Sequence, residues 1–243
     1  LLGGMSWEST VLYYSTINEE TKRRLGGLHS APICLVRVDC AEIERLQHRN
    51  EWDAAADILV EAARAVEAGG GECLVICTNT MHKLADSVQA AIGIPLLHIA
   101  DATGRNLQAD GVGKVALLGT RFTMEEDFYR KRLEDAYGLA VLTPDAEVRQ
   151  AVHRVIYDEL CLGVVSPDSR KVFLGIIDDL GAEGAEAVIL GFIPSDQRKF
   201  SYNFVFGLVL RPVFFSAEYS QIARAEILRE SNQPNRKVPI VRV

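Results

Sequence analysis

The chain has 243 residues, of which 48% are hydrophobic, and this suits one large α/β unit or two small domains. Its formal net charge is -7, its pI is about 5.3 and it has no basic stripe, which argues against a nucleic-acid partner. The apolar run at 204–210 is far shorter than the roughly 20 residues of a membrane span, so no membrane association is expected.

Cysteine usage indicates a reducing compartment. The chain has five cysteines, an odd number, and the three residues between Cys73 and Cys77 exclude a CxxC motif. From this cysteine usage we expect reduced thiols, no disulfides and a cytoplasmic location. The histidines are scattered and form no ligand pair, so we expect no metal site. The chain begins at Leu1 with no initiator Met and no signal peptide, so we expect a few preceding residues to be missing.

The first half of the chain alternates strands with helices. Residues 1–4 are expected to end a buried strand, and Ser6 to cap a helix that runs to about Arg24. A second strand is expected at 33–38. The clearest helix follows, with Asn50 as its expected cap and Gly69 at its end. Its apolar positions repeat at i, i+3, i+4 and i+7, namely Trp52, Ala55, Ala56, Leu59, Ala62, Ala63 and Val66. Short strands at 73–76 and 94–99 are expected to flank a helix that follows Thr80.

The pattern then restarts. Strands are expected at 115–118, 139–142 and 187–190. The helices between them have three expected N-terminal signals: a capping box of Thr123 and Glu126, Asp145, and the pair Ser166-Pro167.

An internal repeat fits this restart. Residues 1–4 match 117–120, and residues 72–76 match 186–190 at a nearly equal offset. The alternative is that any two buried strands look alike. Alternating strands and helices predict a parallel sheet, whose ligands bind beyond the carboxyl ends of its strands.

Cys77 is expected at the end of a strand and the beginning of a helix. A helix N-terminus lowers the pKa of a thiol, and the backbone N–H groups of Thr78, Asn79 and Thr80 can bind a carboxylate. A thiolate beside such a cradle is suited to removing the α-proton of an acid. A small buried cysteine followed by a polar cap is an equally good interpretation of these four residues. Similarly, Gly3-Gly4-Met5-Ser6 can be a ligand-binding turn or a plain turn with an N-cap.

Longer segments carry a family resemblance. Residues 3–10 are Gly-Gly-Met-Ser-Trp-Glu-Ser-Thr and residues 77–83 are Cys-Thr-Asn-Thr-Met-His-Lys. Together with 26–30, 98–103, 117–125 and 159–163, they resemble the aspartate/glutamate racemase family, most closely its bacterial broad-specificity amino-acid racemase branch. The resemblance runs from residue 1 to about Gly191.

The resemblance implies an α/β protein of two pseudo-symmetric, doubly wound parallel-sheet domains, with the active site in the cleft between them. We expect a first half-domain at 1–97, to which the C-terminal helix can add, and a second at 98–211. A C-terminal helix and loose tail are expected at 212–243. A homodimer is expected, with no pyridoxal phosphate, metal or nucleotide cofactor.

The implied activity is cofactor-independent racemisation of a small acidic amino acid, with a related dicarboxylate as another ligand. In the family, one cysteine removes the α-proton and a second returns a proton on the opposite face. Cys77 matches the first of these cysteines. The positions that match substrate-binding residues are Met5, Ser6, Gln47, Thr78, Asn79, Thr80, Thr120 and Cys161. Gln47 is expected in a loop, and Cys161 replaces a lysine that in some relatives pairs with the substrate's side-chain carboxylate.

The chain departs from the family after residue 190. The family's Gly-Cys-Thr-Glu motif is replaced by Gly191-Phe192-Ile193-Pro194, and no cysteine follows Cys161. Residues 192–211 are aromatic and basic and resemble nothing in the family. A frameshift or misjoined segment, which we favour, competes with a natural degenerate homologue and with one-base chemistry. We therefore expect impaired racemisation; the alternatives are a non-catalytic ligand-binding homologue and a lyase acting on a malonate-like acid.

Charged and aromatic residues beside the motifs have plainer interpretations. Lys83, Arg121 and Arg49 are the nearest cations, yet each is more often a solvated surface charge. His82 and His98 are more often packed or capping histidines than acids.

Overall fold

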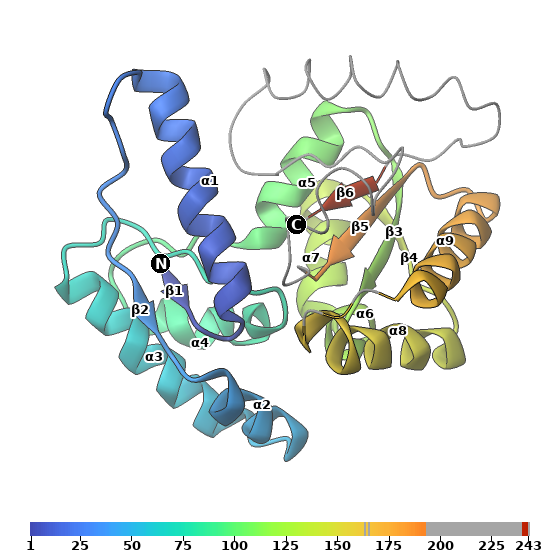
Figure 1. The fold of residues 1–243 in the computed structure, drawn as a ribbon, viewed down its shortest axis with the longest axis horizontal. Helices are drawn as coiled ribbons and strands as arrows, with labels where there is room; N and C mark the ends of the chain where they lie inside the picture. Colours follow the sequence, from blue (N-terminus) through green and yellow to red (C-terminus); the bar gives the residue numbers. More distant parts are fainter. Residues whose placement is uncertain (163, 165, 193–239, 243) are drawn as a thin grey trace. The chain divides into compact units, whose positions relative to one another are not determined.

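The computed structural model describes residues 1–162, 164, 166–192 and 240–242, the last three by their backbone alone. The chain divides into two compact units, Leu1–Ile99 and Ala100–Val243. In each unit, helices flank a small parallel sheet (Figure 1). Of the divergent segment at 192–211, only Phe192 is described. Of the expected C-terminal helix and loose tail at 212–243, only three residues are described, and they form a strand.

The strands in the described part of the chain are short and pair in parallel. Their bounds are β1 (Leu2–Gly3), β2 (Val36–Arg37), β3 (Lys114–Gly119), β4 (Ala140–Leu142), β5 (Ala187–Gly191) and β6 (Ile240–Arg242). The second unit has the order β4-β3-β5-β6. The strands predicted at 115–118, 139–142 and 187–190 are therefore confirmed.

The sheet of the first unit is built from much shorter pairings than predicted. Here β1 pairs with β2, and single parallel bridges join Leu2 to Ile76 and Leu74 to Leu96. The segments predicted as strands at 33–38, 73–76 and 94–99 thus lie in the sheet but pair over only one or two residues each.

The two units share one strand order. The parallel segments of the first unit lie in the order β2, β1, 74–76 and 96, and those of the second in the order β4, β3, β5 and β6. Leu2 pairs with Ile76, and Leu118 pairs with Leu190. The sequence repeat matches Leu2 to Leu118 and Ile76 to Leu190, so the two pairs are equivalent and support a duplication. In each sheet the order in which strands are added reverses beside the first strand, and open α/β sheets bind ligands at such a point.

Helices occupy most of the remaining described chain. The first unit contains α1 (Trp7–Leu25), α2 (Cys40–His48), α3 (Trp52–Ala68), the 3-10 helix η1 (Thr80–Leu84) and α4 (Ala85–Ala90). Helix α5 (Ile99–Ala109) begins at the last residue of that unit. The second unit continues with α6 (Arg121–Glu125), α7 (Asp127–Tyr137), α8 (Ala146–Asp158), the 3-10 helix η2 (Leu160–Leu162) and α9 (Pro167–Ala182).

Three predicted N-caps are confirmed. The side-chain oxygens of Ser6, Asp145 and Ser166 each accept hydrogen bonds from backbone N–H groups in the first turn of α1, α8 and α9. These caps are local contacts over two or three residues, which is why the sequence identifies them.

Two other predicted caps are wrong. Asn50 has a positive φ of 58° and its Oδ1 accepts a hydrogen bond from the Trp52 indole over 2.7 Å, while Glu51 precedes α3 with no side-chain cap. The Thr123–Glu126 capping box is replaced by Thr120, whose hydroxyl accepts the backbone N–H of Thr123. A short helix, α6, therefore begins three residues earlier than the capping box implied.

Each unit has its own hydrophobic core. In the second unit, Val152 of α8 and Phe173 of α9 belong to a cluster with Leu118 of β3. In the first unit, Leu59 of α3 packs in a cluster with Ile76. Every residue of β5 is buried, as expected of a parallel strand covered on both faces. Among the described helices, none is long and apolar enough to cross a membrane.

Candidate active site

Cys77 ends the segment that neighbours β1. Its backbone N–H donates to the carbonyl oxygen of Leu2 over 2.9 Å, and the Leu2 N–H donates to the carbonyl of Val75 over 2.9 Å. The thiol-bearing residue and the Gly3-Gly4 turn therefore follow two adjacent parallel segments. They share the edge where the order of the first sheet reverses, which is the favoured ligand position in such sheets.

The glycine turn has a structural reason as well as an expected ligand role. Gly4 has a φ of 96°, and a Cβ at this position would overlap the backbone of Val38. Its N–H donates to the Thr10 hydroxyl over 2.9 Å. The hydroxyl of Ser6 accepts the N–H of Ser9 and lies 3.0 Å from a carboxylate oxygen of Glu8. The turn thus leaves room for the backbone of Val38, the residue after β2, and caps α1.

The thiol of Cys77 is not the activated thiolate that the sequence predicted. Cys77 is 1% exposed, and burial raises the pKa of its thiol from an ordinary value of 9.0 to about 12. The lowering expected from a helix N-terminus is wrong, since the pKa shift is in the opposite direction; the next helix, the five-residue 3-10 helix η1, begins only at Thr80. Desolvation of the buried thiol is the largest cause of the shift and outweighs the lowering by the positively charged N-terminus. The thiol is therefore protonated at neutral pH and suited to donating a proton.

The polar residues after Cys77 are drawn into the fold. Asn79 is 5% exposed and Thr80 is 6% exposed. The Oδ1 atom of Asn79 is buried and accepts no hydrogen bond from the part of the chain that the structure describes. The carbonyl of Thr78 accepts a hydrogen bond from Nδ1 of His82 over 2.7 Å. A short, largely buried turn therefore carries these side chains.

Gln47 lies on a helix, which corrects the expectation of a loop. Asp39 caps α2 through a hydrogen bond from Ala41, and Gln47 is 8% exposed near the helix end. Its Nε2 lies 3.8 Å from the sulfur of Met81 in η1, and Met5 packs against the same hydrophobic cluster as Met81. Gln47 is thus brought to the element that follows Cys77, and Met5 packs on the core of the same unit.

The remaining expected site residues belong to the second unit. Thr120 follows β3 and caps α6, with its hydroxyl 3.1 Å from that of Thr123. Cys161 is exposed on η2.

Phe192 stands where the family motif places a second cysteine. Its ring meets that of Phe173 edge to face, with centroids 5.5 Å apart, and packs against the core of the second unit. At this end of β5 the chain therefore presents a hydrocarbon ring in contact with the core, where the family presents a thiol.

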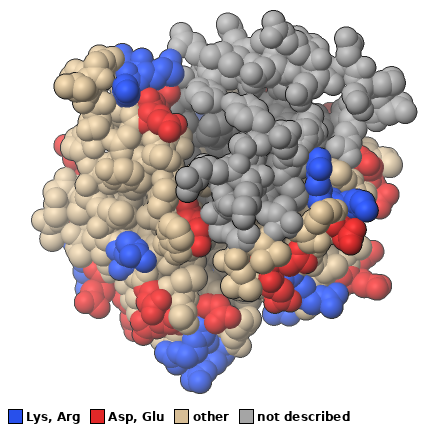
Figure 2. All heavy atoms as spheres, viewed as in Figure 1, with Lys and Arg blue, Asp and Glu red and all other residues tan. Residues whose placement is uncertain are grey.

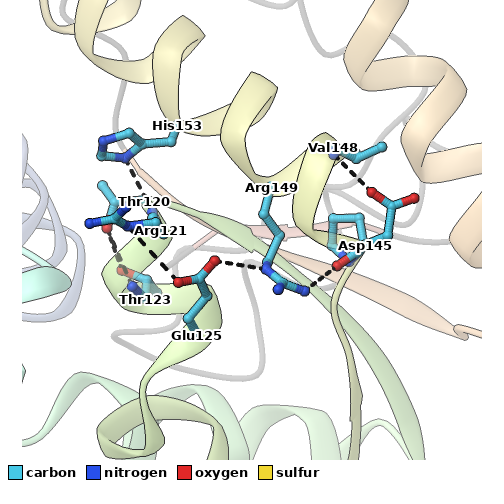
Figure 3. Close-up of polar contacts among 9 residues, drawn as sticks. Thr120, Arg121, Thr123, Glu125, Asp145, Val148, Arg149 and His153 are labelled. Atoms are coloured by element: carbon cyan, nitrogen blue, oxygen red, sulfur yellow. Dashed lines mark hydrogen bonds and ion pairs between the residues drawn. The ribbon is translucent and has the colours of Figure 1, made fainter.

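A charged cluster at the end of β3 went unnoticed in the sequence. Glu125 lies between Arg149, 3.0 Å away, and Arg121, 3.9 Å away (Figure 3). The backbone N–H of Arg121 donates to Nδ1 of His153 over 3.2 Å. The interpretation of Arg121 as a merely solvated charge is thus incomplete. Arg149 is 24 residues from Glu125, so no local pattern identifies the pair.

Lys83, another of the cations singled out, lies over the ring of Trp52. Its ammonium lies 3.8 Å from the centre of the Trp52 ring, a cation–π contact. Within the described residues no group of three or more His, Cys, Asp or Glu side chains could hold a metal ion. On the face shown in Figure 2, acidic and basic side chains are interspersed over the described surface.

Comparisons with known proteins give the family. The Asp/Glu/hydantoin racemase family model matches residues 2–191. A solved structure from Yersinia pestis, provisionally named an Asp/Glu racemase, is 52% identical, covers 78% of this chain and 83% of its own, and superposes with a TM-score of 0.74. An aspartate racemase homologue from Pyrococcus horikoshii OT3 is 27% identical, covers 96% and 98% of the two chains, and has a TM-score of 0.64.

A curated relative gives a shorter match. The broad specificity amino-acid racemase RacX of Bacillus subtilis (strain 168) is 28% identical over 106 residues, which is 44% of this chain and 45% of the relative. The match thus spans less than half the length of that protein. Since the family model covers most of the chain, including Cys77 and both halves of the repeat, the chain belongs to the Asp/Glu/hydantoin racemase family.

Proposed function

We propose that the chain is built for cofactor-independent racemisation of a small acidic amino acid of the aspartate or glutamate type, with Cys77 as one of two proton-transfer groups. The observation that carries the proposal is the position of Cys77. This residue ends the segment beside β1, at the point where the order of the strands in the first sheet reverses. Family membership supplies the reaction class.

The protonation state of Cys77 suggests its role. A thiol whose pKa is raised to about 12 keeps its proton at neutral pH, so it can donate one to a substrate carbanion. To act as a base it must first lose that proton. The ammonium group of a bound amino acid is a nearby positive charge, which favours the thiolate. Cys77 would therefore become basic only with substrate in place.

Substrate contacts are proposed for the residues that match the family's binding positions. In the first unit these are Met5, Ser6, Gln47, Thr78, Asn79 and Thr80. In the second unit they are Thr120 and Cys161. A dicarboxylate would be held by hydrogen-bond donors of the turns, and Arg121, the residue after Thr120, supplies positive charge in the second unit.

A non-catalytic ligand-binding role is the second candidate, and Phe192 favours it. The aromatic ring after β5 has no proton to exchange and packs on Phe173. A chain that retains Cys77 but lacks a donor for the opposite face would bind the substrate and invert it poorly. We propose that racemisation is impaired for this reason.

A homodimer is also part of the proposal. On α1, the side chains Trp7, Val11 and Tyr14 recur at i, i+4 and i+7 and are 58%, 51% and 50% exposed, while Ser9 and Thr10 are buried. A helix that exposes its apolar side is typical of an interface. Glu8 near the beginning of α1 and the basic residues in its last turn favour antiparallel pairing with a second copy. The five free thiols fit a cytoplasmic location.

Proton NMR of L-aspartate and L-glutamate in heavy water, followed by chiral chromatography, tests the proposed reaction. Loss of the α-proton signal reports exchange, and the D enantiomer reports inversion. We expect weak exchange that depends on Cys77 and slower inversion. Binding without exchange would support the ligand-binding role, and absence of both binding and exchange would reject the proposed function.

A further inference from the structure

His82 joins two distant backbone segments inside the first unit. Its Nδ1 lies 2.7 Å from the carbonyl oxygen of Thr78, the residue after Cys77. Its Nε2 accepts the backbone N–H of Ile99 over 3.2 Å. The residue is 2% exposed, so water does not compete for either bond. The imidazole therefore connects the turn that carries the thiol to the beginning of α5.

These two bonds fix the protonation of the ring. The Ile99 N–H can only donate, so Nε2 must be an unprotonated acceptor. The Thr78 carbonyl can only accept, so Nδ1 must carry the proton. An imidazolium would direct a second N–H at the N–H of Ile99. Both contacts thus coexist only in the neutral ring with its proton on Nδ1.

The bond to Thr78 acts on the turn that presents the thiol. In a trans peptide the C=O and N–H groups point in opposite directions, so holding the Thr78 carbonyl fixes the plane of the Thr78–Asn79 peptide. On its other side, Cys77 is held by its own N–H bond to Leu2. The thiol thus sits between two backbone anchors, one in the sheet and one at His82.

We propose that His82 is a positioning residue for the Cys77 thiol: as a neutral imidazole protonated on Nδ1, it ties Thr78 to Ile99 and holds the thiol turn in place. The assignment to catalysis rests on the proposed function, while the tautomer and the anchoring do not. His98 packs edge-on against the ring with centroids 4.6 Å apart, so simple core packing is the competing role. Packing needs the ring's volume alone, whereas positioning needs the Nδ1–H bond.

Three variants separate these roles. His82→Phe keeps a ring of similar size and loses both hydrogen bonds. His82→Asn places an amide N–H near the Nδ1 position, within reach of the Thr78 carbonyl, and loses the bond to Ile99. His82→Gln places an amide near Nε2, able to accept from Ile99, and loses the bond to Thr78. His48→Asn, at an exposed helix position, is the control.

The first readout is the rate of iodoacetamide labelling of Cys77 by peptide mapping, under conditions where thermal unfolding curves show every variant fully folded. We expect labelling about tenfold faster in His82→Phe and His82→Gln, because both lose the buried hydrogen bond to the Thr78 carbonyl that opposes local opening of the thiol turn. The rate in His82→Asn should return toward that of the unmodified chain. If the rates followed the melting temperatures instead, or if His82→Phe labelled as slowly as the unmodified chain, packing would be the role and positioning would be rejected.

The second readout is spectroscopic and needs no activity. Long-range proton–nitrogen NMR, with the His82 signals assigned by their loss in His82→Asn, should show a protonated Nδ1 and an unprotonated Nε2. A proton on Nε2 would overturn the inference. The third readout is exchange, where His82→Phe should lower kcat by up to about 10²-fold with little change in KM, the signature of a misplaced group. If the unmodified chain exchanges no α-proton, the proposed function fails, while labelling and NMR still decide the role of His82.

Discussion

The backbone N–H of Cys77 and the carbonyl of Leu2 are joined by a 2.9 Å hydrogen bond, which fixes the thiol-bearing residue to the first strand of the first sheet. Cys77 itself is 1% exposed, and its sheet neighbours Leu2 and Ile76 are 0% exposed. The position that makes Cys77 a candidate proton-transfer group therefore also gives it a high pKa.

The buried thiol predicts a pH-dependent stability. Burial raises the pKa of Cys77 to about 12, whereas the unfolded thiol titrates near its ordinary 9.0. Between these values the unfolded chain has lost the proton and the folded chain retains it. The contribution of the protonated Cys77 thiol to the free energy of unfolding is complete below about pH 9. It is lost as pH rises toward 12, by at most about 1.4 kcal/mol per pH unit. Urea unfolding from about pH 8 to 10.5 should show a steeper decline for the unmodified chain than for Cys77→Ser.

Exposed thiols provide the control for this measurement. Cys73→Ser should keep the slope of the unmodified chain, because Cys73 is exposed in the same unit. Iodoacetamide at neutral pH should also label Cys73 before Cys77, the reverse of the reactivity that a helix N-terminus implies. Equal slopes in all three proteins would show that the thiol is not desolvated in solution.

Gly4→Ala should strongly destabilise the first unit. The new Cβ would overlap the Val38 backbone at a φ of 96°, so both strain and overlap oppose it. Positive-φ strain alone costs about 1–2 kcal/mol, and overlap with backbone adds to this. Gly70→Ala is the matched control, with a φ of 86° and nothing within 4 Å of the new Cβ. Denaturant unfolding that showed equal costs for both would contradict the tight contact with Val38.

Asn79→Leu should weaken dicarboxylate binding. The side chain is 5% exposed beside Cys77, and loss of a buried donor to a charged ligand costs roughly 1–3 kcal/mol. Titration calorimetry with malate and aspartate measures the effect. Asn106→Leu removes an amide that bonds to Ala102 in α5, outside the proposed site, and should bind as the unmodified chain does. Equal affinity in both variants would remove Asn79 from the site.

Phe192→Cys should raise inversion relative to exchange. It restores Gly-Cys after β5, and loss of one general acid commonly costs about 10²–10⁴ in rate. Phe192→Ser is the control, because both variants lose the aromatic contact with Phe173, a loss of about 0.5–1.5 kcal/mol beyond buried area, and only one gains a thiol. Chiral chromatography reports inversion. Rapid racemisation by the unmodified chain would show that another group already supplies the second proton.

Val11→Glu should disrupt the proposed dimer. The substitution puts a charge in the centre of the exposed apolar stripe on α1, and light scattering after size-exclusion chromatography reports the mass. Glu19→Lys changes an exposed residue on another side of the same helix and should leave the mass unchanged. A monomeric unmodified chain would reject the dimer outright.

Local signals in the sequence determined much of this protein. Ser6, Asp145 and Ser166 cap helices through contacts two or three residues away, and the apolar runs of β3 and β5 form strands where predicted. The motifs around Cys77 were sufficient to indicate the family. Each of these features depends on neighbours in the chain, so its physical cause is visible in the sequence.

The tertiary structure decided what depends on distant residues. Helix α2, which carries Gln47, was not predicted, although Asp39 and the apolar spacing of Ile43 and Leu46 could have indicated it. The pKa of Cys77 follows from burial, and burial requires the packed sheet. The tautomer of His82 follows from Ile99, 17 residues away. A sequence pattern places a residue on an element, but its charge state and hydrogen bonds are set by the residues that the fold brings around it.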